Sequence, residues 1–352
     1  MKNNTERKRE LHYDLLRIIS AFSVVILHCA AQYWYDLDIY GMQWMIANSY
    51  DAIFRFGVPV FVMISGALFL APEYKLDIKR LYKHNILRMV VIYVLWSGLY
   101  GLWDCRYADH SVLGIKDVLR EMMGGRYHLW FLPMIIGIYM ILPILKGWIE
   151  RAGKKQIEYI LILFFVVQIL NQTIRALTVT DELQYILKIL DVELICSYVG
   201  YFILGYYLAH IGIGPKLKRF LYIALLPSVI CNVVLGNYLS HRSGVPTAAI
   251  YDSFGLFTFI TVTALFVFAK DKWKKASYGK AGDFVVKELS ADMLGVYVMH
   301  IGVIEVLEIF GIHSMMMNNV FAIPLLAIIC FAICTLLSSL LRRIPFIGRY
   351  IC

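Results

Sequence analysis

The segment YDLLRIISAFSVVILHCA, residues 13–30, is long and apolar enough for a membrane-spanning helix, yet it contains Asp14, Arg17 and His28. Charged and titratable side chains are costly at membrane depth and usually face a cavity or a partner. Arg17 and His28 are eleven residues apart, which places them on one helix face with a rise of roughly 16 Å between them. Asp14 lies one turn before Arg17, so the three side chains form a polar stripe. The structural alternatives to a functional role are an interfacial Asp14–Arg17 ion pair and an interhelical hydrogen bond of His28.

Similar apolar windows recur along the rest of the chain. A bilayer crossing needs about 20 apolar residues, and ten windows of about this length lie near residues 13–33, 46–70, 86–103, 128–146, 157–177, 193–211, 219–239, 251–269, 291–311 and 319–341. The 352-residue chain is 60% apolar and 17% charged, against roughly 45–50% and about 25% in soluble proteins. This composition excludes a soluble enzyme, a disordered chain and a secreted disulfide scaffold. It predicts an all-α polytopic membrane protein that forms a single domain over residues 1–352.

The basic residues of the loops predict the orientation in the membrane. If the N-terminus is cytoplasmic, 25 of the 34 Lys and Arg residues fall in cytoplasmic segments and six fall on the opposite side. Cytoplasmic loops carry an excess of Lys and Arg. We therefore expect both termini in the cytoplasm and a multi-pass protein of the cytoplasmic (plasma) membrane. The net charge of +9 reflects these loops, so no nucleic-acid partner is expected.

Neither the cysteines nor a glycine-rich loop indicates a metal site, a disulfide framework or a nucleotide site. Seven cysteines are scattered through the chain without CxxC spacing, which indicates neither a disulfide framework nor a zinc site. We expect no metal. The chain also lacks a Walker or GxGxxG loop, so nucleotide hydrolysis is not indicated.

Two further predicted spans carry costly polar side chains. Asp51 and Arg55 in the second span have the i, i+4 spacing of an ion pair, and Arg55 falls at about the depth of His28. Arg55 is either one member of a purely structural ion pair or a cation that binds an anionic group or a developing oxyanion. His300 lies in the middle of the ninth span, where its structural alternative is a hydrogen bond between helices.

A polar and aromatic group marks the outer start of the fourth span, where Arg126, Tyr127, His128 and Trp130 follow one another closely. An aromatic belt at the membrane interface accounts for Tyr127 and Trp130. His128 is less easily explained in that way. We therefore expect Arg126, His128 and Trp130 to contribute to substrate binding.

The run KLDIKRLYKHNILR, residues 75–88, is rich in basic side chains. The enrichment of Lys and Arg in cytoplasmic loops explains most of this run without any ligand. The functional alternative is a seat for a phosphate-bearing ligand formed by Arg80, Lys83 and Arg88, because guanidinium and ammonium groups bind phosphate.

These features resemble the acyltransferase-3 family of integral membrane acyltransferases. The resemblance rests on five motifs that occur in order along nearly the whole chain. They are YDLLRIISAFSVVILHCA (13–30), RFGVPVFVMISGALFL (55–70), HLWFLPMIIGIYMILPIL (128–145), GYFILGYYL (200–208) and LGVYVMH (294–300).

The resemblance implies that a cytoplasmic acyl-CoA, usually acetyl-CoA, delivers its acyl group to an acceptor hydroxyl on the outer side. His28 corresponds to the essential histidine of the family, and Arg17 to its paired basic residue. Arg80 lies where the family has an arginine-rich motif after the second helix. Its usual two-arginine spacing is not reproduced, because Arg80 is followed by Lys83 and the next arginine is Arg88.

The expected chemistry is acyl transfer from a thioester to a hydroxyl. His28 would take the proton of the acceptor or form a transient acyl-histidine, since histidine titrates near neutral pH. Arg55 or His300 would stabilise the tetrahedral oxyanion, and Arg17 with Asp14 would line the passage of the pantetheine arm.

The expected acceptor is a lipid-linked sugar or a cell-surface polysaccharide, and its choice is expected to depend on the loop at residues 104–127. Membrane lipid is a further expected partner, and a homo-oligomer is possible. The alternative function is transport of a small polar solute such as serine, since relatives include the membrane part of serine-transporting proteins of vancomycin resistance. A structural scaffold is a third alternative, but it leaves the polar stripe of the first span unexplained.

Overall fold

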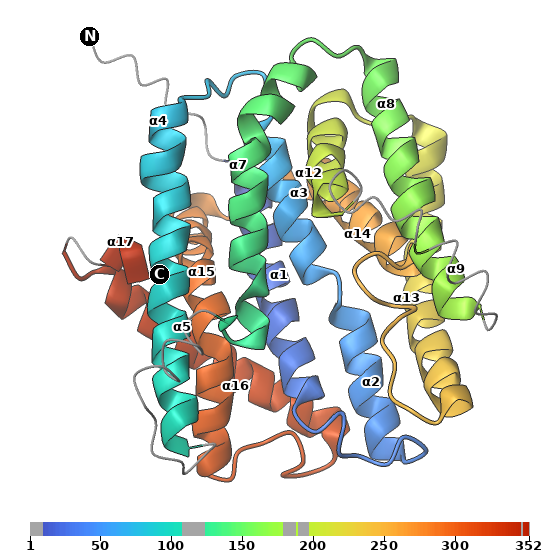
Figure 1. Cartoon of the computed structure of the whole chain (residues 1–352), viewed down its shortest axis with the longest axis vertical. Coiled ribbons are helices and arrows are strands. Elements are labelled where there is room, and N and C mark those ends of the chain that lie inside the picture. Colours follow the sequence, from blue (N-terminus) through green and yellow to red (C-terminus); the bar gives the residue numbers. More distant parts are fainter. Residues whose placement is uncertain (1–9, 108–123, 179–187, 189–196, 346–347, 352) are drawn as a thin grey trace.

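The computed structural model describes residues 10–107, 124–178, 188, 197–345 and 348–351, and its regular elements are helices (Figure 1). No strand occurs among these residues, so the predicted all-α architecture is confirmed. The elements are α1 (Leu11–Ala31), α2 (Met42–Phe54), α3 (Gly57–Phe69), α4 (Ile78–Arg80), η1 (Leu81–Ile86), α5 (Leu87–Tyr107), η2 (Tyr127–Trp130), α7 (Phe131–Ile149), α8 (Lys154–Leu163), η3 (Phe164–Leu170), α9 (Asn171–Leu177), α12 (Tyr198–Tyr206), η4 (Tyr207–Ile211), α13 (Pro215–Ser243), α14 (Leu256–Phe268), η5 (Ala269–Trp273), α15 (Gly279–Ile309), α16 (Asn319–Arg342) and α17 (Gly348–Ile351).

Eight helical segments of the described chain are long and apolar enough to cross a membrane. They are α1, α2 with α3, α4 through α5, η2 with α7, α8 through α9, α13, α15 and α16. The window predicted at 193–211 contains the shorter pair α12 with η4, and its residues 193–196 lie outside the described part. The window predicted at 251–269 contains α14 and ends where η5 begins. The protein is therefore an integral multi-pass membrane protein, and the count of ten spans stays a prediction.

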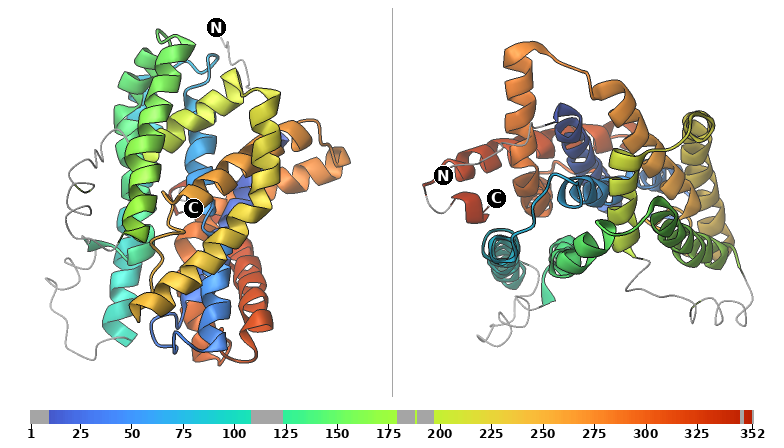
Figure 2. Two further views of the ribbon diagram at one scale, coloured as in Figure 1. Left: turned by 90° about the vertical axis from the view of Figure 1, so that its right-hand side faces the viewer. Right: turned by 90° about the horizontal axis from the view of Figure 1, so that it is seen from above.

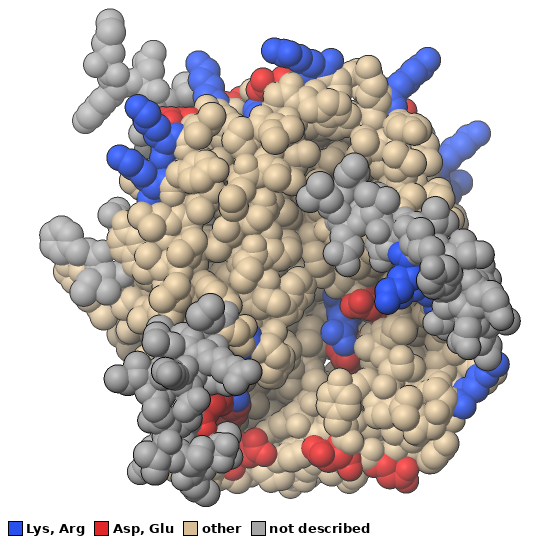
Figure 3. All heavy atoms as spheres, viewed as in Figure 1, with Lys and Arg blue, Asp and Glu red and all other residues tan. Residues whose placement is uncertain are grey.

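Charge divides the molecule into two ends. On the face drawn in Figure 3, Lys and Arg side chains gather at the end where α4 lies, and Asp and Glu side chains gather at the opposite end. We call the first of these the basic end. Helix α1 starts at the basic end and packs against α2, α3, α15 and α16. It lies with α3 near the centre of the bundle (Figure 2).

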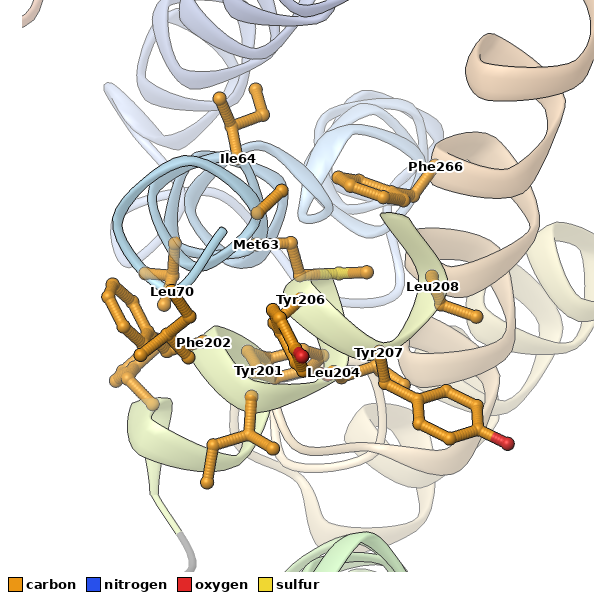
Figure 4. Close-up of a cluster of buried hydrophobic side chains, with 14 of the residues drawn as sticks. Met63, Ile64, Leu70, Tyr201, Phe202, Leu204, Tyr206, Tyr207, Leu208 and Phe266 are labelled. Atoms are coloured by element: carbon orange, nitrogen blue, oxygen red, sulfur yellow. The ribbon is translucent and has the colours of Figure 1, made fainter. Parts of the chain in front are cut away.

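The helices α3 and α12 touch through their backbones because each contributes a glycine to the contact. A Cβ atom at Gly66 would lie 1.7 Å from the carbonyl oxygen of Phe202, and one at Gly205 would lie 2.0 Å from that of Met63. Large apolar side chains, including those of Met63 and Phe202, surround this contact (Figure 4). Small residues allow such close approach between membrane helices. The motifs at residues 55–70 and 200–208 therefore form one tightly packed pair.

The second span is interrupted where α2 ends and α3 begins, at Arg55 and Phe56. Pro59 has no N–H to donate to the carbonyl of Arg55, four residues earlier, so a continuous helix would lack one hydrogen bond here. Gly57 follows the break, and a Cβ atom at that position would lie 2.2 Å from the Ser23 hydroxyl of α1. The break thus places the Arg55 side chain in the middle of the span and brings the backbone of α3 against α1.

Candidate active site

Three histidines from three separate elements lie next to one another. The ring centroids of His28 on α1 and His300 on α15 are 5.0 Å apart, and those of His128 in η2 and His300 are 5.2 Å apart. Contact between α1 and α15 along their lengths brings the first two together. His128 joins them at the start of α7. We call these three side chains the histidine cluster.

The hydrogen bonds of the histidine cluster leave several nitrogens open to a ligand. Nδ1 of His300 lies 2.6 Å from the carbonyl oxygen of Tyr297, which can only accept, so Nδ1 donates and Nε2 carries the lone pair. Nε2 of His300 and both ring nitrogens of His128 are buried without a hydrogen-bond partner. Buried polar atoms are nearly always paired in folded proteins. Unpaired nitrogens in adjacent rings therefore make the histidine cluster a candidate binding site for a polar ligand.

Two tyrosines fix the surroundings of His128. The Tyr297 hydroxyl donates to the backbone carbonyl of His128. The Tyr100 ring stands edge-on to the imidazole of His128, with 4.9 Å between centroids. The Tyr100 hydroxyl donates to the carbonyl of Val298 at 2.8 Å and accepts from the amide of Gly302 at 3.0 Å. These contacts hold η2, α5 and α15 in a defined relation around the cluster.

A cavity of about 240 Å³ lies between the helices and reaches Tyr297, whose ring centroid is 6.1 Å from that of His300 and 6.3 Å from that of His128. Arg17 and Arg88 contribute the two cationic side chains of its wall. The remaining lining residues come from the helices that enclose the cavity. They are Val24 of α1, Val58, Phe61 and Ser65 of α3, Met89 of α5, Phe131, Ile135 and Tyr139 of α7, and Ser290, Ala291, Met293 and Leu294 of α15. We call this space the arginine-lined cavity.

The arginine at the wall of this cavity is held by a buried carboxylate. Nη1 of Arg17 lies 2.9 Å from Oδ1 of Asp14, and the Ser290 hydroxyl donates to the same oxygen at 2.7 Å. Asp14 is fully buried, whereas the Arg17 side chain remains partly exposed. Val24 lies about two helical turns after Arg17 and one turn before His28, and it lines the same cavity. Of the three residues in the polar stripe predicted along α1, Arg17 lines the cavity, Asp14 pairs with Arg17, and His28 is not part of the lining.

Arg55, which follows α2, forms part of a second polar network. Its guanidinium pairs with Asp51 and lies over the ring of Tyr251, 5.4 Å from the centroid. The Tyr251 hydroxyl donates to Oδ1 of Asn48 at 2.5 Å. Nε of Arg55 is buried without a hydrogen-bond partner, and the guanidinium charge is close enough to act on His28. The predicted Asp51–Arg55 ion pair is present, but Arg55 still has a donor to offer.

The polar residues predicted before the fourth span separate into two environments. Arg126 forms ion pairs with Glu305 and, at 3.0 Å, with Asp104, and it lies over the ring of Tyr100 at 5.1 Å. Trp130 instead contacts Tyr198, at 5.4 Å between centroids, and stays largely exposed. The structure therefore brings Arg126 to the neighbours of the histidine cluster but gives Trp130 no contact with it. The loop predicted at 104–127 falls mostly outside the described residues, which omit 108–123.

The three basic residues predicted to hold a phosphate-bearing ligand also separate. Arg88 lines the arginine-lined cavity. Arg80 and Lys83 are exposed on α4 and η1, and Asp77 caps this turn by accepting from the Arg80 amide at 3.2 Å. Arg88 is thus the member of this set with access to the interior, and the other two lie nearer solvent at the basic end.

Three neighbours of the candidate active site were not predicted from the sequence. They are Tyr100, Ser290 and Tyr297. For Tyr297 a signal existed, because it lies one helical turn before His300 in the segment LGVYVMH. Tyr100 and Ser290 offered none, since each looks like an ordinary residue of an apolar helix. Their importance arises only from which helices pack together.

A family model described as an acyltransferase domain matches residues 11–341, nearly the whole chain. The chain belongs to the acyltransferase-3 family. The resemblance inferred from the five motifs is thus confirmed, and the protein is a membrane acyltransferase. No curated protein and no solved structure matches it. Within the described ranges, the acyltransferase has no group of three or more His, Cys, Asp or Glu side chains placed to hold a metal ion.

Proposed function

We propose that this acyltransferase moves an acyl group, acetyl in the simplest case, from cytoplasmic acyl-CoA to a hydroxyl of a lipid-linked or extracytoplasmic glycan. The observation that supports the proposal is that the arginine-lined cavity reaches Tyr297, whose ring is the neighbour of His300 and His128 in the histidine cluster. A thioester donor needs a long, narrow passage with cations at its mouth and a base at its end. The basic end is the cytoplasmic end in this proposal, and the membrane is the plasma membrane.

The arginine-lined cavity suits the donor in shape and charge. Arg17 and Arg88 would bind the pyrophosphate of CoA, because guanidinium groups pair with phosphate through two parallel hydrogen bonds. Asp14 and Ser290 would keep Arg17 oriented along the wall. Arg80 and Lys83, exposed near the mouth, would meet the remaining phosphate. The apolar walls between these cations and Tyr297 would hold the pantetheine arm.

His28 is the proposed base. It would take the proton of the acceptor hydroxyl while the hydroxyl oxygen attacks the thioester carbonyl carbon. The resulting tetrahedral intermediate would collapse with cleavage of the carbon–sulfur bond, and the imidazolium of His28 would return the proton to the leaving CoA sulfur. In the alternative covalent route, the imidazole nitrogen first accepts the acyl group and then passes it to the acceptor.

The oxyanion and the acceptor would be held by the residues around His28. In its present tautomer His300 offers a lone pair at Nε2 and no donor, so it suits the proton of an acceptor hydroxyl or of His28 rather than an oxyanion. Arg55 has an unpaired buried N–H and a full positive charge, so it is the better partner for the oxyanion. His128 and Arg126 would contact the acceptor.

The deciding experiment is release of free CoA from acetyl-CoA by the purified protein with a crude glycan acceptor, compared between wild type and His28→Ala. We expect turnover in the wild type and a loss of at least about 100-fold in the variant, the usual contribution of a general base. Turnover that survives the substitution would move the base to His300. If calorimetry on the wild type detects no CoA binding, the serine-type transporter becomes the better proposal.

A further inference from the structure

A second cavity, of about 350 Å³, lies between α5, α15 and α16. Its walls are apolar, with Leu99 and Trp103 on α5, Val306 on α15 and Leu337 on α16 among them, and it has no Lys, Arg, Asp or Glu side chain in its lining. Tyr100 is the one lining residue with a hydroxyl group. We call this space the apolar groove.

The helices around the apolar groove are suited to a hydrocarbon environment. All three helices that form it are among the eight that are long and apolar enough to cross a membrane. Trp96, Leu99 and Trp103 lie on one face of α5, since their spacing is three and four residues. A ligand that enters between these helices from the bilayer must itself be apolar, because polar groups are costly at this depth.

Tyr100 connects the apolar groove to the histidine cluster. Its ring lines the groove and also stands against His128 at 4.9 Å. Gly302 forms the facing wall, where a Cβ atom would lie 3.3 Å from the Tyr100 hydroxyl. A larger side chain at Gly302 would press on Tyr100, so the glycine permits the close contact between α15 and the Tyr100 hydroxyl. The groove therefore ends one aromatic ring away from the proposed chemistry.

A group of charged side chains lies beside Tyr100, where the apolar groove meets the histidine cluster. Arg126 covers the Tyr100 ring and is paired with Glu305 and Asp104. Glu305 directly precedes Val306, which lines the groove. Apolar lining thus gives way within one residue to carboxylates and a guanidinium, which can hydrogen-bond the hydroxyls of a sugar. The arrangement suits an amphipathic ligand, with a long apolar tail and a polar head.

We propose that the apolar groove binds the hydrocarbon tail of a lipid-linked sugar acceptor, with its sugar beside Arg126 and Glu305. This inference rests on the proposed function, since it assigns the acceptor of that reaction. The donor is the poorer occupant, because CoA carries phosphates and the arginines that suit them line the other cavity. Two substrates would then reach the histidine cluster by separate routes, one from the basic end and one from the bilayer.

Tryptophan quenching tests the tail site without any assumption about turnover. The probe is a polyprenyl phosphate with brominated double bonds, added at rising mole fraction to the purified protein in nanodiscs of unbrominated lipid. We expect quenching that saturates at low mole fraction and that is largely lost when Trp96 and Trp103 are replaced together by Phe. Quenching that rises linearly without saturation would mean contact with bulk lipid and would overturn the proposal.

Variants that fill the groove make the test specific. Val306→Phe and Leu337→Phe place a larger ring inside it, whereas Val94→Phe and Leu340→Phe make the same changes at exposed positions of α5 and α16 that do not line it. We expect the first pair to raise the half-saturating mole fraction at least tenfold and the second pair to leave it within about twofold. Equal effects of both pairs, or no effect of the first, would contradict a tail site.

Two further experiments distinguish this proposal from a binding site for the acyl chain of the donor and from the proposed function itself. Palmitoyl-CoA should not compete with the brominated probe, and competition would reassign the groove to the acyl chain of a long donor. Val306→Phe should reduce CoA release much more with a lipid-linked sugar as acceptor than with the water-soluble methyl glycoside of the same sugar, and equal losses with both acceptors would contradict a tail site. Wild-type protein that releases no CoA but binds the probe saturably would contradict the proposed function and leave the lipid site standing.

Discussion

The imidazole rings of His28 and His300 lie 5.0 Å apart between centroids, although one belongs to the first helix of the chain and the other to the penultimate long helix. The contact depends on α1 and α15 packing along their lengths, with the Asp14–Ser290 hydrogen bond at 2.7 Å near the basic end. A single helix pair therefore carries the proposed base, its neighbour and the arginine anchor of the donor route.

The tautomer of His300 leads to the first prediction. Because Nδ1 is used by the carbonyl of Tyr297, the atom that faces the site is Nε2. The amide of glutamine reaches the position of Nε2, whereas that of asparagine reaches only the position of Nδ1. We expect His300→Gln to keep kcat within about tenfold of wild type and His300→Asn and His300→Ala to lose about 100-fold or more. The CoA-release assay measures all three, and equal losses in Gln and Ala would show that His300 moves a proton itself.

The two environments of the basic residues lead to the second prediction. Arg88 lines the arginine-lined cavity, while Arg80 is exposed on α4. A charge-assisted hydrogen bond to a phosphate contributes roughly 1.5–3 kcal/mol, so Arg88→Ala should raise the KM for acetyl-CoA about 10-fold to 100-fold with little change in kcat. Arg80→Ala should raise it by no more than about threefold. A larger effect at Arg80 would place the phosphates outside the cavity and contradict the proposed donor route.

The buried carboxylate beside Arg17 leads to the third prediction. Asp14 accepts hydrogen bonds from both Arg17 and Ser290, whereas Ser290 contributes one of these bonds. Ser290→Ala should therefore lower stability by about 1 kcal/mol, and Asp14→Ala should lower it more, because it leaves a partly buried guanidinium without its counter-charge. Thermal unfolding in detergent gives the order of stability. Both variants should also raise the KM for acetyl-CoA, and an unchanged KM would make the ion pair purely structural.

The backbone contact between α3 and α12 leads to the fourth prediction. A methyl group at Gly66 or Gly205 has no room, so Gly66→Ala and Gly205→Ala should each cost at least about 1–3 kcal/mol and lower the Tm by about 3 °C or more. Gly137→Ala in α7 is the matched control, since a Cβ atom there meets nothing within 4 Å. It should leave the Tm unchanged or raise it, because alanine favours a helix by roughly 0.5–1 kcal/mol over glycine. A fall in the control as large as that in the first two would contradict the packing argument.

Relations within one helix could be predicted from the sequence, because the helical repeat fixes them. The spacing of Arg17 and His28 predicted a common face, and the structure places Arg17 and the intervening Val24 on one cavity wall. The i, i+4 spacing of Asp51 and Arg55 predicted the ion pair that is seen. The apolar windows likewise predicted the eight long helices, since membrane thickness sets their length.

Relations between helices could not be predicted in the same way. Nothing in a single sequence states that α5 packs beside η2, so the contact of Tyr100 with His128 was not foreseen. The same limit explains why Arg80, Lys83 and Arg88 were treated as one set, although the start of α5 turns Arg88 alone toward the interior. The second span was predicted as one window over residues 46–70, and the effect of Pro59 on the position of Arg55 becomes clear only once the helices are placed.

The interruption between α2 and α3 divides one membrane crossing into two mechanically different halves. A span that lacks a backbone hydrogen bond bends more easily at that point than a continuous helix. Above the joint, α3 packs tightly against α12 through Gly66 and Gly205, which fixes the position of the α3 wall of the arginine-lined cavity. Below it, α2 is held to α13 by the side-chain hydrogen bond between Asn48 and Asn237. In the proposed orientation, this joint would let the outer half of the span move to admit acceptors of varied shape while the half beside the proposed donor passage keeps its shape.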